Sequence, residues 1–338
     1  MKLIGVLIFN ALIVCGLVPA EPPGAPKLAQ HLPVLYWTEG IETAATLKRH
    51  GIEMIAAPPE KAAAWRNAGF RVVAIAEREL DGRQKLLVPR IAGRANVASA
   101  TSRPWIDANG WRFARKPAGK FYYDLAQNAR NRTQLAVAEA FAYKADAVLK
   151  IDPSELAQFG EIIKFIRELP GENYSSLADI GVIDNGSDTV AEVLNLLTRR
   201  NLLFKIIPAH SSKYRVNIKL GTKEYPESAA ADPSEFAQKI RRRLGDENRT
   251  VRIYGSETVI ARLTGDSRNF RLHLLNYSAV EMEGLRVRLL HANKSGTNSW
   301  AFGYGTFHPE TPLTENGAFE FSIPRMGIYA VIDGHLTQ

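Results

Sequence analysis

The hydrophobic pattern of this chain changes near Thr250, and that change constrains the fold more than any other feature of the sequence. Before Thr250, short apolar runs alternate with segments whose apolar residues recur at helical spacing. After it, six strand-like segments follow one another, separated by Gly, Asn, Ser and Asp. They are Val251–Tyr254, Thr258–Leu263, Phe270–Tyr277, Leu285–Leu290, Ala318–Ile323 and Ile328–Ile332. We therefore expect an α/β body over residues 33–250, followed by a small all-β antiparallel sandwich over residues 251–336.

Strands and helices alternate through the body. Helices are expected over Glu42–His50 and Glu60–Ala68, each ended by a glycine and followed at once by an apolar strand. This order is typical of β-α-β crossovers, in which neighbouring strands run parallel. The strands expected along the body are Pro33–Trp37, Glu53–Ala57, Arg71–Ala76, Leu86–Val88, Phe121–Asp124, Ala147–Ile151, Ile180–Asp184, Leu203–Ile207 and Tyr214–Leu220. A full β/α barrel takes about 250 residues, so a compact or incomplete barrel is expected here.

In the tail, alternation along a strand predicts which side chains face water. The run Phe270-Arg271-Leu272-His273-Leu274 alternates cleanly between apolar and polar residues. An antiparallel sheet with one wet face buries the apolar set, so we expect Arg271 to be solvated and the leucines to lie inside.

The first twenty residues have the pattern of a secretory signal peptide. The apolar run Leu3–Val18 ends in Val18-Pro19-Ala20, whose small residues fit cleavage before Glu21. The run is shorter than the roughly 20 residues that span a bilayer, so no transmembrane segment is expected in the mature chain. A retained anchor and lipid attachment at Cys15 are the alternatives. Residues 21–32 are expected to form a tether, and the protein is expected to be secreted or periplasmic.

Composition excludes several kinds of chemistry. Cleavage removes Lys2, lowering the formal net charge from +8 to +7, and leaves no cysteine for disulfides, thiolate metal sites or nucleophiles. The tight basic cluster Arg241-Arg242-Arg243 falls on a helical segment, so a solvated helix face is expected rather than a nucleic-acid partner. The seven histidines show no metal-ligand spacing and no cofactor motif occurs, so neither a metal nor a cofactor is expected.

Three acidic residues follow predicted strands. In parallel α/β proteins, catalytic groups lie at the carboxyl ends of strands. Asp124 ends a strand and has no capping duty, Glu39 follows the first strand, and Asp152 follows Ala147–Ile151. Because proline and Ser-Glu come next, Asp152 has a second interpretation as a helix N-cap. These three are the candidate catalytic residues.

Aromatic and amide side chains near these acids predict a sugar site. Indole and phenol rings stack on pyranose faces, and an asparagine supplies hydrogen bonds. The candidates for substrate binding are Trp37, Trp105, Asn109, Trp111 and Tyr123, and Tyr122 is a further ring that could stack on a sugar. Large aromatic residues also fill cores, and that alternative stays open for each ring.

Two parts of the chain resemble family-42 β-galactosidases. The middle part is similar to the opening β-α-β unit of their flavodoxin-like domain, and the tail to their terminal β domain. The stretches that carry the resemblance are Ile180–Asp184 with Glu192–Asn201, and His273–Tyr277 with Gly284–Val287, Phe321–Pro324 and Tyr329–Val331. The resemblance implies a secreted bacterial glycoside-hydrolase-like protein with a reduced barrel, a flavodoxin-like segment over about 178–250 and a C-terminal β domain. These enzymes use a glutamate that commonly follows an asparagine; no Asn-Glu pair ends a strand here, so no catalytic residue is carried over.

Two functions are consistent with these patterns. The first is an exported carbohydrate-active or carbohydrate-binding protein of glycoside-hydrolase descent, with hydrolysis left open. The second is a non-catalytic surface or assembly protein whose middle and β domains mediate homo-oligomerisation.

Overall fold

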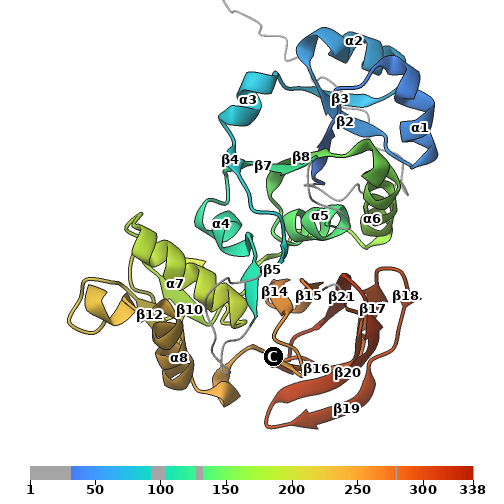
Figure 1. The fold of residues 1–338 in the computed structure, drawn as a ribbon. Helices are drawn as coiled ribbons and strands as arrows, with labels where there is room; N and C mark the ends of the chain where they lie inside the picture. The colour runs from blue at the N-terminus through green and yellow to red at the C-terminus, as the bar shows by residue number, and fades with distance from the viewer. Residues whose placement is uncertain (1–31, 93–103, 127–131, 279, 338) are drawn as a thin grey trace, which may run out of the picture.

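The computed structural model of the chain describes residues 32–92, 104–126, 132–278 and 280–337. The predicted signal peptide, with Cys15, and the tether up to residue 31 lie outside these ranges. Within them, no helix is both long and apolar enough to cross a bilayer. A parallel-sheet body, a middle segment and a β-sandwich lie against one another (Figure 1).

A six-stranded parallel sheet, called sheet A below, forms the centre of the body in the order β3-β2-β1-β8-β7-β4. Its strands are β1 (Val34–Tyr36), β2 (Met54–Ala57), β3 (Arg71–Ala74), β4 (Gln84–Lys85), β7 (Lys120–Leu125) and β8 (Asp146–Ile151). The predicted parallel order is confirmed, although β4 precedes the expected Leu86–Val88. Strands β3 and β4 are the edges, so the sheet does not close into a barrel within the described ranges.

The crossover helices of the body share one face of sheet A. They are α1 (Ala44–Arg49), α2 (Pro59–Asn67), α5 (Thr133–Ala142) and α6 (Leu156–Glu168). One core joins these helices to alternate strand residues such as Leu35 and Tyr123. The other face carries Tyr36, Tyr122 and Val148, which pack with α3 (Glu77–Asp81). The four longer helices thus share one face, as in a barrel wall, whereas a doubly wound sheet carries long helices on both; the second face of sheet A has the five-residue α3.

The middle segment is a smaller parallel unit with its own core. Strand β10 (Ile180–Val182) lies between β11 (Phe204–Ile206) and β12 (Val216–Ile218). Helices α7 (Asp188–Arg199) and α8 (Pro233–Leu244) pack on it, and both begin where a side chain, Ser187 or Asp232, caps backbone N–H groups. The remaining elements near it are α4 (Gly110–Arg115), β5 (Arg90–Ala92) and β6 (Trp105–Asp107).

Two antiparallel sheets form the predicted sandwich. The first has β13 (Val251–Tyr254), β16 (Met282–Leu290), β20 (Ala318–Met326) and β19 (Glu310–Glu315) in that order. The second has β18 (Gly305–Thr306), β17 (Asn298–Ala301), β21 (Tyr329–His335), β15 (Asn269–Asn276), β14 (Val259–Gly265) and β9 (Ser175–Ser176). Strand β9 comes from before the predicted tail, and β17, β18 and β19 fill a stretch where no strand was predicted.

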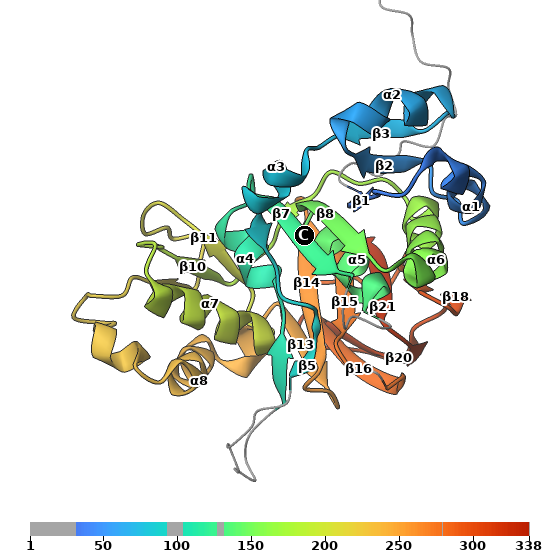
Figure 2. The ribbon, with the colours of Figure 1, turned by 45° about the horizontal axis from the view of Figure 1, so that its top comes forward.

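The prediction that Arg271 faces water is wrong, since only 1% of Arg271 is exposed. Helices α5 and α6 lie between its sheet and sheet A (Figures 1 and 2), and Phe165 of α6 packs edge-on against Tyr329 of β21. The second sheet therefore has a protein face where a wet one was expected. Arg271 stays charged there because Asp333 accepts two hydrogen bonds from it, at 2.6 and 2.5 Å.

Candidate functional site

Asp124 lies near the carboxyl end of β7 and is open to solvent. Its side chain is 36% exposed, and its Oδ2 lies 3.2 Å from Nζ of Lys85 on the neighbouring strand β4. No described helix begins at Asp124. An exposed ion pair of this kind contributes little to stability, so the fold alone does not require this carboxylate.

The other two predicted acids lie beyond the ends of adjoining strands. Glu39 is exposed in the loop after β1. Asp152 follows β8, and its Oδ1 accepts hydrogen bonds from N and Oγ of Ser154, at 2.9 and 2.6 Å. The N-cap interpretation of Asp152 is thus confirmed. Because β8 separates β1 from β7, the ends that carry Glu39 and Asp124 are about 10 Å apart. All three acids lie along the carboxyl ends of the strands of sheet A, which we call its carboxyl edge. Their catalytic role stays a prediction.

Alternation along the strands decides which aromatic residues accompany Asp124. Tyr122 and Tyr36 lie on its side of sheet A, with Glu77 of α3 close to both. Burial raises the pKa of Tyr122 well above its usual value, and the carboxylates of Asp124 and Glu77 raise it further. Oε1 of Glu77 also lies 3.9 Å from Nζ of Lys150 on β8. The site therefore mixes two carboxylates, two ammonium groups and two phenols.

Tyr36 and Glu77 were not among the candidates named from the sequence, and Tyr122 was named only as a further ring that could stack on a sugar. The strand period of two, applied from Asp124, would have favoured Tyr122 over Tyr123. Nothing in the sequence places Glu77 there, because the approach of α3 to this face is a tertiary contact.

Trp37 and Tyr123 face the opposite way, toward the helices. Trp37 is 3% exposed, and its indole N–H donates to Oγ1 of Thr43 at 2.9 Å. Tyr123 is fully buried. A ligand that contacts Asp124 therefore meets Tyr122 before either of these rings.

Tyr123 and Asn109 come together around Glu139 of α5, which is itself fully buried. Oε2 of Glu139 accepts from the Tyr123 hydroxyl at 2.5 Å and from Nδ2 of Asn109 at 3.0 Å. Oε1 accepts from the Tyr277 hydroxyl at 2.5 Å and from the backbone N–H of Asn109 at 2.6 Å. We call these four residues the Glu139 cluster.

Each carboxylate oxygen of the Glu139 cluster has two donors, as a buried carboxylate requires. Burial nevertheless raises the pKa of Glu139, against the lowering effect of the hydrogen bonds from the two tyrosines. The donors come from β7, from the residue before α4 and from the sandwich, so the cluster joins separate parts of the chain. Its sequence signal is a single glutamate in the otherwise apolar run Leu135–Ala142.

Trp105 and Trp111 lie beside the middle segment. Trp105 packs against its core with the Arg199 guanidinium 3.8 Å from the ring centroid. Trp111 is 8% exposed, and the Arg112 guanidinium lies 4.3 Å from its ring. Both rings are already covered by protein groups, and neither accompanies Asp124.

Among the described residues, no three His, Cys, Asp or Glu side chains group closely enough to hold a metal ion.

Comparison with known proteins finds similarity in fold but none in sequence. Neither models of protein families nor curated protein sequences match the chain. Among solved structures, it is similar to α-L-fucosidase isoenzyme 2 from Paenibacillus thiaminolyticus, with a TM-score of 0.51 and 12% identity. The alignment covers 87% of this chain and 71% of the fucosidase.

Two further structures are more distant. A β-galactosidase from Bacillus circulans sp. alkalophilus has a TM-score of 0.38 and 10% identity, over 83% of this chain and 63% of that one. A GH42 exo-carrageenase from Bacteroides ovatus has a TM-score of 0.35 and 8% identity, over 71% and 47%. The structural neighbours of this chain are thus glycoside hydrolases, family-42 enzymes among them, and the similarity to the fucosidase extends over most of the chain.

Proposed function

We propose that this protein is an exported carbohydrate-active protein that receives a sugar at the carboxyl edge of sheet A. The position of Asp124 is the observation that carries this proposal. It is a partly exposed carboxylate near a strand end, beside buried phenols and a second carboxylate, and its ion pair with Lys85 is an exposed one that contributes little to stability.

The fold supports the same location by analogy. The chain shares its fold with a protein named as a fucosidase. Enzymes with β/α barrels place their active sites at the carboxyl ends of the strands, and the four longer helices on one face give sheet A the character of a barrel wall. Fold alone does not fix chemistry, so the site residues must decide it.

Hydrolysis is the finer form of the proposal. It needs a second carboxylate about 5.5 Å from the first for retention, or about 6.5–9.5 Å for inversion. Glu39 and Glu77 are the exposed acids expected to complete the pair with Asp124, because Asp152 already serves as a cap. Tyr122 would lie beneath the sugar.

A glycan array and a panel of chromogenic glycosides test both forms of the proposal. Asp124→Asn should weaken glycan binding at least tenfold and abolish any release of the chromophore. Asp146→Asn is the matched control, since Asp146 is also ion-paired, to Arg83 at 2.9 Å, but lies at the amino end of β8. Equal loss in both variants, or no loss in Asp124→Asn, would remove this edge of the sheet from the function.

Export is tested separately. Expression with the native N-terminus, followed by fractionation and N-terminal sequencing, should yield a periplasmic or secreted chain that begins at Glu21. A chain that keeps Met1 in the membrane fraction would instead indicate a retained anchor. Release from the membrane by Cys15→Ser alone would indicate lipid attachment.

One observation favours assembly as the alternative function. Strand β19 is an edge strand whose six residues are all exposed, and Leu313 on it is 47% exposed. Exposed edges are ready to pair with another chain. Light scattering on the purified protein should then show a dimer or larger species that Leu313→Lys dissociates, and a monomer at all concentrations would exclude this alternative.

A further inference from the structure

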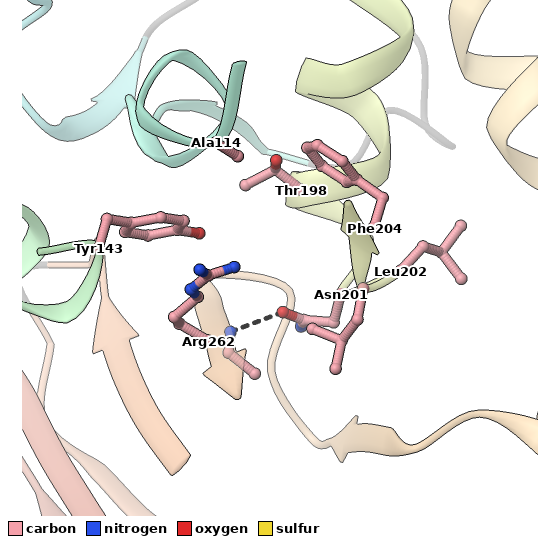
Figure 3. Close-up of a pocket in the computed structure, with 9 residues that line it drawn as sticks. Ala114, Tyr143, Thr198, Asn201, Leu202, Phe204 and Arg262 are labelled. Carbon is pink, nitrogen blue, oxygen red and sulfur yellow. Dashed lines mark hydrogen bonds between the residues drawn. The ribbon is translucent and has the colours of Figure 1, made fainter. Parts of the chain in front are cut away.

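A small pocket lies where the body, the middle segment and the sandwich meet (Figure 3). Its wall combines residues from each part: Ala114 of α4, Tyr143 after α5, Thr198 of α7, Phe204 of β11 and Arg262 of β14. The cavity volume is about 20 Å³, which is room for one or two species the size of water.

Among the described residues that line the pocket, Arg262 is the one charged residue, and its guanidinium points into the pocket (Figure 3). Its Nε is buried without a hydrogen-bond partner. In the described ranges, no Asp or Glu forms an ion pair with it or lies close enough to shift its pKa. Apart from Glu21, every acidic side chain of the sequence belongs to those ranges. A cation held this close to the interior normally has a counter-charge.

Nearby cations show the usual arrangement. Arg271 is paired with Asp333 at 2.5 Å, and Lys144 with Glu172 at 3.0 Å. Directly across from Arg262 on β15 lies His273. Burial lowers the pKa of His273 well below its usual value, and the nearby cations lower it further, so the ring is neutral at neutral pH. This part of the sandwich therefore has positive charge in excess.

Two other polar side chains of the pocket, Thr198 and Asn201, already have hydrogen-bond partners within the protein. Thr198 Oγ1 donates to the carbonyl of Leu194 at 3.0 Å, and both ends of the Asn201 amide bond backbone groups of β14. The Arg262 guanidinium lies over the Tyr143 ring, 4.9 Å from its centre, and the Tyr143 hydroxyl lies beside the guanidinium (Figure 3). Burial raises the pKa of Tyr143 to about 12, so this hydroxyl remains a donor at neutral pH.

We propose that the pocket binds one small monovalent anion, of the size of chloride or formate, between the guanidinium of Arg262 and the hydroxyl of Tyr143. The sign follows from the guanidinium without a carboxylate, and the size from the cavity volume. Because three parts of the chain supply the wall, a bound anion stabilises their packing against one another. The site is separate from the carboxyl edge of sheet A.

Thermal unfolding at constant ionic strength tests the proposal. Sodium gluconate, whose anion is too large for the cavity, is replaced stepwise by sodium chloride and, in a second series, by sodium formate. The melting temperature of the wild type should rise by about 2–4 °C and then saturate, as expected for a ligand that binds only the folded state. The anion with the larger rise at equal concentration identifies the preferred ligand.

Arg262→Gln should remove this rise, and Arg262→Lys should shift it to higher anion concentration. Arg252→Gln on β13, whose partner Asp246 lies 3.7 Å away, should keep the wild-type rise. No rise in the wild type, or an equal rise in Arg262→Gln, would overturn the proposal. If Arg262→Gln does not fold, a wild-type crystal soaked in bromide decides: an anomalous peak within hydrogen-bond distance of the guanidinium supports the site, and its absence overturns it.

Discussion

Glu139 and Asp124 are carboxylates of the same body, fifteen positions apart, with opposite surroundings. Glu139 is fully buried and accepts hydrogen bonds from Tyr123, Tyr277 and Asn109. Asp124 is 36% exposed and has one ammonium group at 3.2 Å. The number of donors around a carboxylate separates a group that holds the fold from one that is available to a ligand.

The helical layer explains the difference. Helix α5 lies between sheet A and the sandwich (Figure 2), and its Glu139 side chain is fully buried there. Within the described ranges, the carboxyl edge of sheet A is not covered in this way at Asp124, whose side chain is 36% exposed. The predictions below test whether this contrast holds, from the largest expected change in stability to the smallest.

Glu139→Ala should lower the free energy of unfolding by about 3–5 kcal/mol. The change leaves buried donors from three residues without an acceptor and opens a cavity. Urea denaturation followed by circular dichroism measures the loss. Glu168→Ala, at an exposed position of α6, is the control and should change stability by less than about 0.5 kcal/mol. A loss below 1 kcal/mol for Glu139→Ala would show that the Glu139 cluster is not structural.

Tyr277→Phe should lower the free energy of unfolding by about 1–3 kcal/mol, because it removes one of the four hydrogen bonds to Glu139 and the one from the sandwich. The same denaturation experiment measures it. Tyr254→Phe on β13, which lies partly exposed, should be close to neutral. Equal effects of the two substitutions would mean that the bond from Tyr277 does not tie the sandwich to the body.

The raised pKa of Glu139 predicts a pH dependence. The folded state holds this proton more tightly than the unfolded state, so the favourable contribution is complete below the ordinary carboxyl pKa. It is lost as pH rises through the raised pKa. The wild type should therefore lose stability relative to Glu139→Gln between pH 4 and pH 8. A difference between the two that stays constant or grows with pH would contradict the direction of this shift.

Asp152→Ala should cost about 1 kcal/mol, the usual value for an N-cap, because two hydrogen bonds from Ser154 are lost. The melting temperature measures this effect. Asp152→Asn, which keeps the acceptor oxygen, should restore most of the stability. Wild-type stability combined with lost glycan binding in Asp152→Ala would instead assign Asp152 to the ligand site.

Asp124→Asn should change the free energy of unfolding by less than about 0.5 kcal/mol, because it breaks only an exposed ion pair. Thermal melting, measured beside the glycan-binding assay, separates stability from function. A large loss of stability would place Asp124 with Glu139 among structural carboxylates and would end the contrast between them.

The local order of the body could be predicted from sequence. Glycines such as Gly51 and Gly69, both at positive φ, end helices where L-residues are disfavoured, and an apolar strand follows each. Strand β4 was misplaced, and β17, β18 and β19 were missed. The two-residue β4 and β18 and the exposed β19 have no apolar run that would mark them, and the four-residue β17 begins with two polar residues.

The candidate site could be predicted only in part. Asp124 was predicted because it ends a strand, where catalytic groups of parallel sheets lie. Trp37 and Tyr123 were chosen because they are close in sequence to Glu39 and Asp124. On a strand, the adjacent residue points to the opposite face, so nearness of one position selects the wrong side of the sheet. Tyr122 is two positions from Asp124 and therefore points to the same face of the sheet, where Tyr36 packs with it.

By itself, the sequence determined the order of the main helices and strands of the body and that neighbouring strands there run parallel, because caps, glycine stops and apolar periods are local. Only the tertiary structure decided which faces are wet. Arg271 and Glu139 are buried because the sandwich packs against α5 and α6, and a contact between distant segments leaves no local pattern in either of them.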